Sequence, residues 1–260
     1  NKIIKKTAYW KHDFTQNNSL SFPEAVQKLD LLLNDATASR LMSDVPLGVF
    51  LSGGLDSSTI AYYAQKNTTE KINTFSIGFE NKSYDESDYA KLVAGHIGTE
   101  HHTQVLTSQH ALELMDEIYA FIDEPFADAS LIPTYFLSKF TRQHVKVALG
   151  GDGSDELLAG YPTFISDKFK KPFSSLSPAL INIFLKLANT TLPASDKNIS
   201  FDFKVKQYLR GFLSKKHHIH QLWLGSFTPD EKERLFQPDV YASLQEQSGL
   251  SIIDYHFEHT

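Results

Sequence analysis

The stretch Leu47–Gln65, LGVFLSGGLDSSTIAYYAQ, is the first that could carry out chemistry, because an apolar run stops there at two glycines. Glycines let backbone N–H groups approach phosphate oxygens closely, and a helix beginning just after them would add the positive end of its dipole. Asp56 would repel a bare phosphate, so its presence favours a Mg²⁺ ion between the two. A capped strand-to-helix turn explains the same residues without a ligand. The stretch lacks the Gly-Lys-Ser/Thr ending of a Walker A loop.

A second glycine-rich loop, GGDGSDE at residues 150–156, carries three more carboxylates in Asp152, Asp155 and Glu156. Beside a phosphate these groups would repel one another unless a cation lay between them. Taken alone, the loop could be a surface turn. A calcium loop is excluded because the bidentate Glu is missing at the required distance.

The elements that must position these loops follow from hydrophobic patterning. Continuous apolar runs are typical of strands covered on both faces, as in a parallel sheet. Such runs alternate here with helical periodicity, which predicts βαβ units in a doubly wound α/β sheet over residues 45–161. Ligands of such sheets bind beyond the carboxyl ends of the strands, where both loops fall. The predicted strands are Leu47–Leu51, Ile72–Phe79, Glu100–Leu106 and Val145–Gly151. The predicted helices are Pro23–Leu41, Ser57–Gln65, Asp85–Ile97, a helix that begins at Ser108, and Pro133–Gln143. The helix from Ser108 carries Leu112, Met115, Ile118 and Ile122 on one face.

The amino-acid composition limits the classes of protein to which this chain can belong. The 260 residues are 41% hydrophobic and 22% charged with a net charge of −6, which is ordinary for a globular protein and disfavours nucleic-acid or membrane partners. No run is long and apolar enough to span a bilayer, and the first residues lack the apolar core of a signal peptide. The absence of Cys excludes disulfides, thiolate metal sites and a catalytic thiol. We therefore expect a cytoplasmic protein, with a mostly α-helical segment over residues 163–260.

Together the two loops resemble a known family. The first is similar to the pyrophosphate-binding SGGxDS loop of the N-type ATP pyrophosphatases (PP-loop superfamily). The second, with DEPFADASLIPTYFLS upstream and ELLAGY downstream, resembles the synthetase domain of glutamine-hydrolysing asparagine synthetases. The similarity runs from about Tyr9 to the end and is densest over residues 47–58, 74–79, 124–137 and 147–161. It implies an adenine nucleotide alpha hydrolase-like core at residues 23–162.

The resemblance implies a ligase that uses ATP and Mg²⁺. The side-chain carboxylate of aspartate would attack the α-phosphate and release pyrophosphate, and ammonia would convert the aspartyl-adenylate into asparagine and AMP. By similarity, the pyrophosphate would be held by Ser52, Gly53, Gly54, Asp56 and Ser57. Phe50 and Ile77 would contact adenine through their backbones, Leu51 would take part in ATP binding, and Gly78, Gly150 and Gly151 would line the nucleotide. Asp56 and Asp155 would bind Mg²⁺, and Asp152 with Asp56 would serve catalysis.

Two positions depart from the family pattern SGEGSDE. Asp152 stands where the best-known members carry Glu, which shortens that side chain by one methylene, and Gly150 replaces a Ser, which removes a hydroxyl. Members also begin with a glutaminase domain whose nucleophile is Cys. We therefore expect the chain to be part of a longer polypeptide, with residues 1–22 as a linker from that domain, a missing downstream segment and weak activity alone. The glutaminase domain would be the partner that supplies ammonia, and a homodimer is compatible with the sequence.

Three alternatives remain at this point. A related amidotransferase or β-lactam-type synthetase would activate a different carboxylate. A tRNA-modifying enzyme could use the same loop, although sulfur-transfer members usually need cysteines. A non-catalytic nucleotide-binding module would not need to keep Asp56 and Asp155.

Several residues invite a functional interpretation that we discount. His101 and His102 are neighbours in a strand and point to opposite faces, so a shared metal is disfavoured. His217, His218 and His220 lie in a basic stretch and are predicted to form a solvated helix face. Asp123, Glu124 and Asp128 fit either a position near the substrate or a capped loop.

Overall fold

The structure is a computed structural model, and it describes residues 5, 7, 9–10, 19–124, 126, 128–195, 197, 199–225, 227–245 and 249–258. The chain folds as two compact units. Residues 23–161 form the α/β unit, and residues 162–195 together with 199–260 belong to the helical unit. Among the described residues, no helix combines the length and apolarity needed to cross a membrane.

The α/β unit is built on a sheet of four parallel strands in the order β3-β2-β1-β4. The register places Val49 opposite Thr74 on one side and opposite Leu149 on the other. The prediction of a doubly wound parallel sheet is therefore confirmed. The strands are β1 (Leu47–Phe50), β2 (Asn73–Phe79), β3 (Glu100–Leu106) and β4 (Val147–Leu149).

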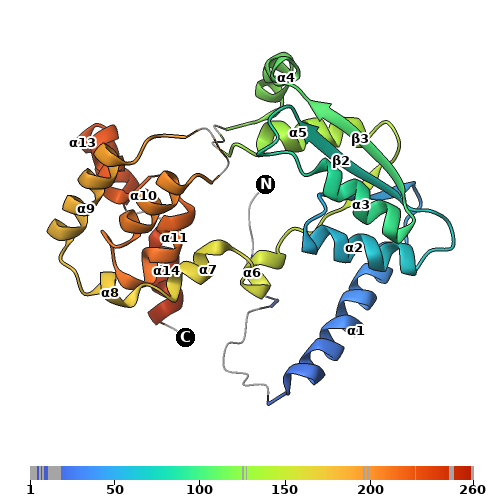
Figure 1. The fold of residues 1–260 in the computed structure, drawn as a ribbon, viewed down its shortest axis with the longest axis horizontal. Coiled ribbons are helices and arrows are strands. Elements are labelled where there is room, and N and C mark those ends of the chain that lie inside the picture. The colour runs from blue at the N-terminus through green and yellow to red at the C-terminus, as the bar shows by residue number, and fades with distance from the viewer. Residues whose placement is uncertain are drawn as a thin grey trace. The chain divides into compact units, whose positions relative to one another are not determined.

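Helices cover both faces of this sheet, as Figure 1 shows with α2 and α3 on one side and α5 on the other. Val49 and Leu51 pack with alanines of α2 and α3, whereas Ile77 and Phe79 pack with α4 and α5. The predicted helices are all present, with ends shifted by a few residues. They are α1 (Phe22–Arg40), α2 (Leu55–Lys66), α3 (Ser87–Ile97), α4 (Ser108–Phe121) and α5 (Leu131–Thr141), and the short helix α6 (Ser154–Leu158) was not predicted.

The face predicted for α4 is wrong at Leu112, which is 70% exposed. Ile118 of that face is buried, and Leu114, which was not assigned to it, is buried beside Ile118 against Leu106 and Phe136. The helix carries two overlapping apolar stripes at helical spacing, and periodicity alone does not choose between them. Contact with β3 and α5 makes the choice.

The helical unit is α-helical throughout its described part, as predicted. Its core joins Ile181 and Ala188 of α9 to Leu209, Phe212 and Trp223. Its elements are α7 (Pro162–Asp167), α8 (Lys171–Ser174), α9 (Pro178–Thr191), α10 (Phe201–Gly211), the 3₁₀ turn η1 (Lys216–His218), α11 (Ile219–Leu224), α12 (Pro229–Leu235), α13 (Pro238–Gln245) and α14 (Gly249–Glu258).

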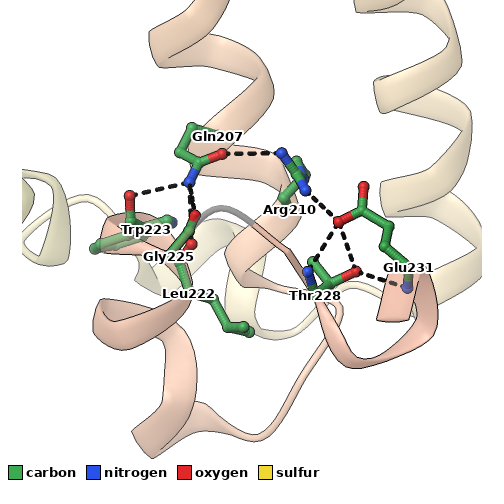
Figure 2. Close-up of polar contacts among 7 residues, drawn as sticks. All are labelled: Gln207, Arg210, Leu222, Trp223, Gly225, Thr228 and Glu231. Carbon is green, nitrogen blue, oxygen red and sulfur yellow. Dashed lines mark hydrogen bonds and ion pairs between the residues drawn. The ribbon is translucent and has the colours of Figure 1, made fainter. Parts of the chain in front are cut away.

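A polar network from α10 fixes the end of α11 and the start of α12 (Figure 2). The Gln207 side-chain N–H group donates to the carbonyls of Leu222, Trp223 and Gly225 at 3.1, 3.0 and 2.9 Å. Its oxygen accepts from Arg210, whose guanidinium also pairs with Glu231. Glu231 completes a capping box with Thr228 at the start of α12. The carbonyls that a helix end leaves without internal partners are thus satisfied.

Candidate functional site

Both glycine-rich loops lie at one edge of the sheet. The chain runs from β1 to β2 and β3 on one side, then returns to β4 on the other side of β1. The strand order therefore reverses between β1 and β4, which is where ligands bind in open α/β sheets. Residues 51–54 follow β1 and residues 150–153 follow β4, so the two loops meet at this switch point.

The first loop is held by its own hydroxyls. The Ser52 and Ser57 hydroxyls lie 2.9 Å apart, and the Gly54 backbone N–H donates to Ser52 Oγ at 3.2 Å. Gly53 has φ of +84°, and a β-carbon there would lie 2.6 Å from the backbone of Tyr89 and Ala90. Glycine is therefore required both by conformation and by space. Helix α2 begins at Leu55, two residues before its predicted start, so Asp56 stands in its first turn.

The second loop packs against the first, backbone to backbone. A β-carbon on Gly151 would lie 2.8 Å from the Ser57 amide nitrogen and 2.9 Å from the Asp56 carbonyl carbon. The Ser154 hydroxyl donates to the Gly151 carbonyl at 2.9 Å and closes the turn before α6. The absence of a side chain at Gly151 thus allows the two loops to form one wall.

The loops border a pocket of about 580 Å³ in the α/β unit. Gly53, Gly54 and Gly78 are predicted site residues that lie beside it without lining it. A β-carbon on Gly78 would lie 3.2 Å from Oδ1 of Asp85. The predicted residues that line the pocket are Phe50, Leu51, Ser52, Asp56, Ser57, Ile77, Gly150, Gly151, Asp152 and Asp155.

The pocket is strongly acidic. Its described lining has five carboxylates and no Lys, Arg or His. Burial, and secondly the charge of Asp155, raises the pKa of Asp56 above its ordinary value. No described residue hydrogen-bonds or pairs with the carboxylates of Asp56, Asp152 or Asp155. Neighbouring free carboxylates are the donor set that Mg²⁺ prefers when phosphate oxygens complete its shell, so these residues fit the expected ion.

Further lining residues were not predicted as site residues. They are Phe75, Ser76, Phe79, Tyr84, Glu86, Pro133, Thr134, Leu137, Gly153, Glu156 and Tyr161. The Tyr161 hydroxyl donates to Glu156 Oε1 at 2.6 Å, and this bond raises the pKa of Tyr161 to about 12. Tyr84 and Glu86 follow β2, so the rule that places ligands at strand carboxyl ends could have found them.

The histidine predictions have mixed outcomes. His101 hydrogen-bonds Thr74 at 2.9 Å, while His102 bonds Asn73 and stacks on Phe75, so the two rings face opposite sides of the sheet as predicted. The solvated helix face predicted for the second cluster is wrong for His218, which is buried in the helical unit. The local charge pattern indicated solvent, but contact with α14 covers the ring.

The acidic stretch before α5 resembles a capped loop. Asp128 Oδ1 accepts the Ser130 backbone N–H at 2.8 Å. The described residues of this stretch do not line the pocket, whereas Pro133, Thr134 and Leu137 of α5 do. Pro125 and Ala127 lie outside the described residues.

Comparison with known proteins was made on sequence and on structure. The family model for asparagine synthase matches residues 28–248. A Methanocaldococcus jannaschii protein with the provisional name asparagine synthetase 2 (glutamine-hydrolyzing) is 37% identical over 217 residues, which are 81% of this chain and 39% of that protein. Asparagine synthetase 1 of Bacillus subtilis is 38% identical over 59% of this chain and 24% of its own length. The human asparagine synthetase is 35% identical over 52% of this chain and 26% of its own length.

The chain thus spans about two fifths or less of these relatives. Among solved structures, an ammonia-dependent NAD synthetase of Campylobacter jejuni aligns with 78% of this chain and 97% of its own chain, at 16% sequence identity. The TM-score of this alignment is 0.36, which is too low to establish a shared fold. The family match, in contrast, extends over most of the residues described above. The chain belongs to the asparagine synthase family.

Proposed function

We propose that this chain is the synthetase part of a ligase that activates the side-chain carboxylate of aspartate with ATP and transfers it to ammonia, giving asparagine, AMP and pyrophosphate. The observation that carries the proposal is the acidic pocket at the switch point between β1 and β4, bordered by both glycine-rich loops. Family membership and the relatives' names agree with this activity.

The proposed binding roles follow from position. Ser52, Ser57 and the backbone N–H groups of Gly53 and Gly54, at the start of α2, would hold pyrophosphate. Phe50, Leu51 and Ile77, at the ends of β1 and β2, would contact adenine. Gly78, Gly150 and Gly151 would let the nucleotide approach the backbone. Asp56 and Asp155 would hold Mg²⁺, which would neutralise the phosphate charge.

The proposed chemistry balances with ATP, aspartate and ammonia. A carboxylate oxygen of aspartate bonds to the α-phosphorus of ATP. At the same time the bond between the α-phosphorus and the oxygen that leaves with pyrophosphate breaks. Ammonia then attacks the acyl carbon, the bond to AMP breaks, and nitrogen loses a proton. Asp152, which lines the pocket, would receive or orient that proton. Positioning and charge neutralisation supply most of the acceleration, since the adenylate is itself a reactive anhydride.

An isotope experiment tests this proposal. The polypeptide is incubated with Mg²⁺-ATP, ammonia and aspartate labelled with ¹⁸O in its side-chain carboxylate, and products are analysed by mass spectrometry. One label must appear in AMP, because the oxygen that attacks phosphorus leaves with AMP.

ADP, unlabelled AMP or product formation without aspartate would reject the proposed reaction. Replacing aspartate by a panel of other carboxylic acids then separates a wrong acid from a wrong mechanism. The Asp155→Asn variant is the control, and it is expected to lower the rate of labelled AMP formation about 10²–10³-fold.

A further inference from the structure

Three potential metal ligands converge in the helical unit, outside the pocket described above. The Nε2 atoms of His217 and His218 both contact Oδ1 of Asp254, the second at 2.6 Å. One ligand atom from each residue lies within 4.8 Å of the other two. The histidines come from η1 and the aspartate from α14, so the cluster joins two elements 36 residues apart.

Two of the remaining polar atoms of this cluster, one on His218 and one on Asp254, also have partners. The His218 side chain is 5% exposed, and its Nδ1 lies 3.4 Å from the Ser214 hydroxyl. The second oxygen of Asp254 lies 3.1 Å from the Lys215 ammonium. Metal-binding histidines and carboxylates characteristically engage their outer atoms in this way, which fixes ring orientation and tautomer. With Nδ1 carrying the proton, the His218 imidazole can present an unprotonated Nε2 toward the same point as the Nε2 of His217.

The chemistry of the donors selects the ion. Two imidazole nitrogens and one carboxylate oxygen suit Zn²⁺ and similar transition metals, whereas Mg²⁺ and Ca²⁺ prefer oxygen throughout. We propose that His217, His218 and Asp254 bind one Zn²⁺ ion, which cross-links η1 to α14. Bonds of about 2.1 Å in a tetrahedron require donors about 3.4 Å apart, so Nε2 of His218 and Oδ1 of Asp254, now 2.6 Å apart, need to separate by about 1 Å.

A metal-free latch is the competing explanation. In a latch both rings carry a proton on Nε2 and donate it to the same carboxylate oxygen. Lys215 contributes a positive charge near the cluster. Its ammonium contacts Oδ2 of Asp254, so Oδ1 of Asp254 is left for coordination. The two explanations differ in their response to metal, to removal of Lys215 and to loss of one imidazole.

Zinc binding to the purified chain distinguishes them. The protein is dialysed against EDTA, then against buffered Zn²⁺, and bound metal is counted by mass spectrometry. We expect one Zn²⁺ per chain, and an increase of about 5–10 °C in the unfolding midpoint of the whole chain at 100 times the dissociation constant, reversed by EDTA. Co²⁺ in place of Zn²⁺ is expected to give the visible absorption of a four- or five-coordinate site with nitrogen ligands.

Variants separate coordination from packing. His217→Gln and Asp254→Asn, which keep size, are expected to weaken Zn²⁺ binding more than about 100-fold, because each removes a ligand. Lys215→Met is expected to strengthen binding, since a competing charge is lost, whereas it would weaken a latch. His96→Ala, an exposed imidazole in the α/β unit, is the matched control and should leave affinity unchanged.

The proposal is overturned if the chain binds no Zn²⁺, or if His217→Gln, Asp254→Asn and His96→Ala bind it equally. It is also overturned if Lys215→Met lowers both affinity and the metal-induced shift in midpoint. None of these outcomes depends on the nucleotide pocket, so they do not bear on the proposed ligase activity.

Discussion

The pocket of the α/β unit and the ion pairs of the helical unit handle charge in opposite ways. The pocket in the α/β unit gathers Asp56, Asp152 and Asp155 without a described hydrogen bond or ion pair to any of them. In the helical unit, acids of α10, α12 and α14 face Lys or Arg, as in Lys206–Asp202 and Arg210–Glu231.

The contrast separates stability from function. A paired carboxylate holds two elements together and contributes modestly to folding. Unpaired carboxylates gathered at a sheet edge repel one another, so they are expected to lower stability until a cation or ligand arrives. The raised pKa of Asp56 is a direct sign of this repulsion and burial. Charge left unpaired at the switch point therefore indicates a site.

The largest expected effect comes from removing an unpaired carboxylate. Asp155→Asn and Asp56→Asn are each expected to lower the rate of aspartate-dependent pyrophosphate release about 10²–10³-fold, through lost charge neutralisation. The unfolding midpoint should stay constant or rise, because repulsion is relieved. Asp202→Asn, which breaks a paired carboxylate in the helical unit, is the control. A similar loss of rate in the control would remove the distinction between the two units.

The next effect concerns the network in Figure 2. Gln207→Glu places a carboxylate against three carbonyl oxygens and is expected to lower the free energy of unfolding by about 3 kcal/mol. Gln207→Met, which removes the donors and the oxygen that accepts from Arg210 without adding a charge, should cost about 1–2 kcal/mol. Urea denaturation measures both. The exposed Gln221→Glu on α11 is the control, and an equal loss there would show that added charge alone is responsible.

A smaller effect tests the close approach of the two loops. Gly151→Ala adds a β-carbon against the backbone of Asp56 and Ser57, and about 1–3 kcal/mol of stability should be lost together with nucleotide binding. Gly95→Ala in α3 meets open space and should gain about 0.5–1 kcal/mol from helix propensity. Urea denaturation and a nucleotide-binding titration check both variants. Equal stability of the two would contradict the packing of the loops.

The smallest effect is a dependence on pH. The pKa of Asp56 is raised from 3.8, so its ionisation opposes folding: this cost is absent below the ordinary value and appears as pH rises through the raised value. The free energy of unfolding of Asp56→Asn should therefore rise relative to that of the unaltered chain as the pH increases from the ordinary to the raised pKa. Denaturation without divalent cations measures this difference. Added Mg²⁺ should reduce the difference in free energy of unfolding at higher pH. A difference that stays constant with pH would contradict the repulsion.

Patterning alone predicted the elements of the α/β unit. Strands such as Leu47–Leu51 are continuous apolar runs, and parallel sheets bury both faces of their strands, so the run itself specifies the element. The predicted helix ends were less accurate. Helix α2 begins at Leu55 and not at Ser57, because its N-cap residue is Gly54, which has no side chain to cap the first turn. The two loops were identified as a site from glycines, hydroxyls and acids, which are local features.

Tertiary structure decided what depends on distant neighbours. Tyr84, Glu86 and Tyr161 join the pocket because the sheet brings together loops that are far apart in sequence. Leu114 is buried in α4 instead of Leu112 because β3 and α5 lie against that side. His218 is buried, against its local charge pattern, because α14 returns Asp254 to the turn that holds it. Periodicity and motif report the chain's own chemistry, whereas burial and pairing are set by which elements meet in the fold.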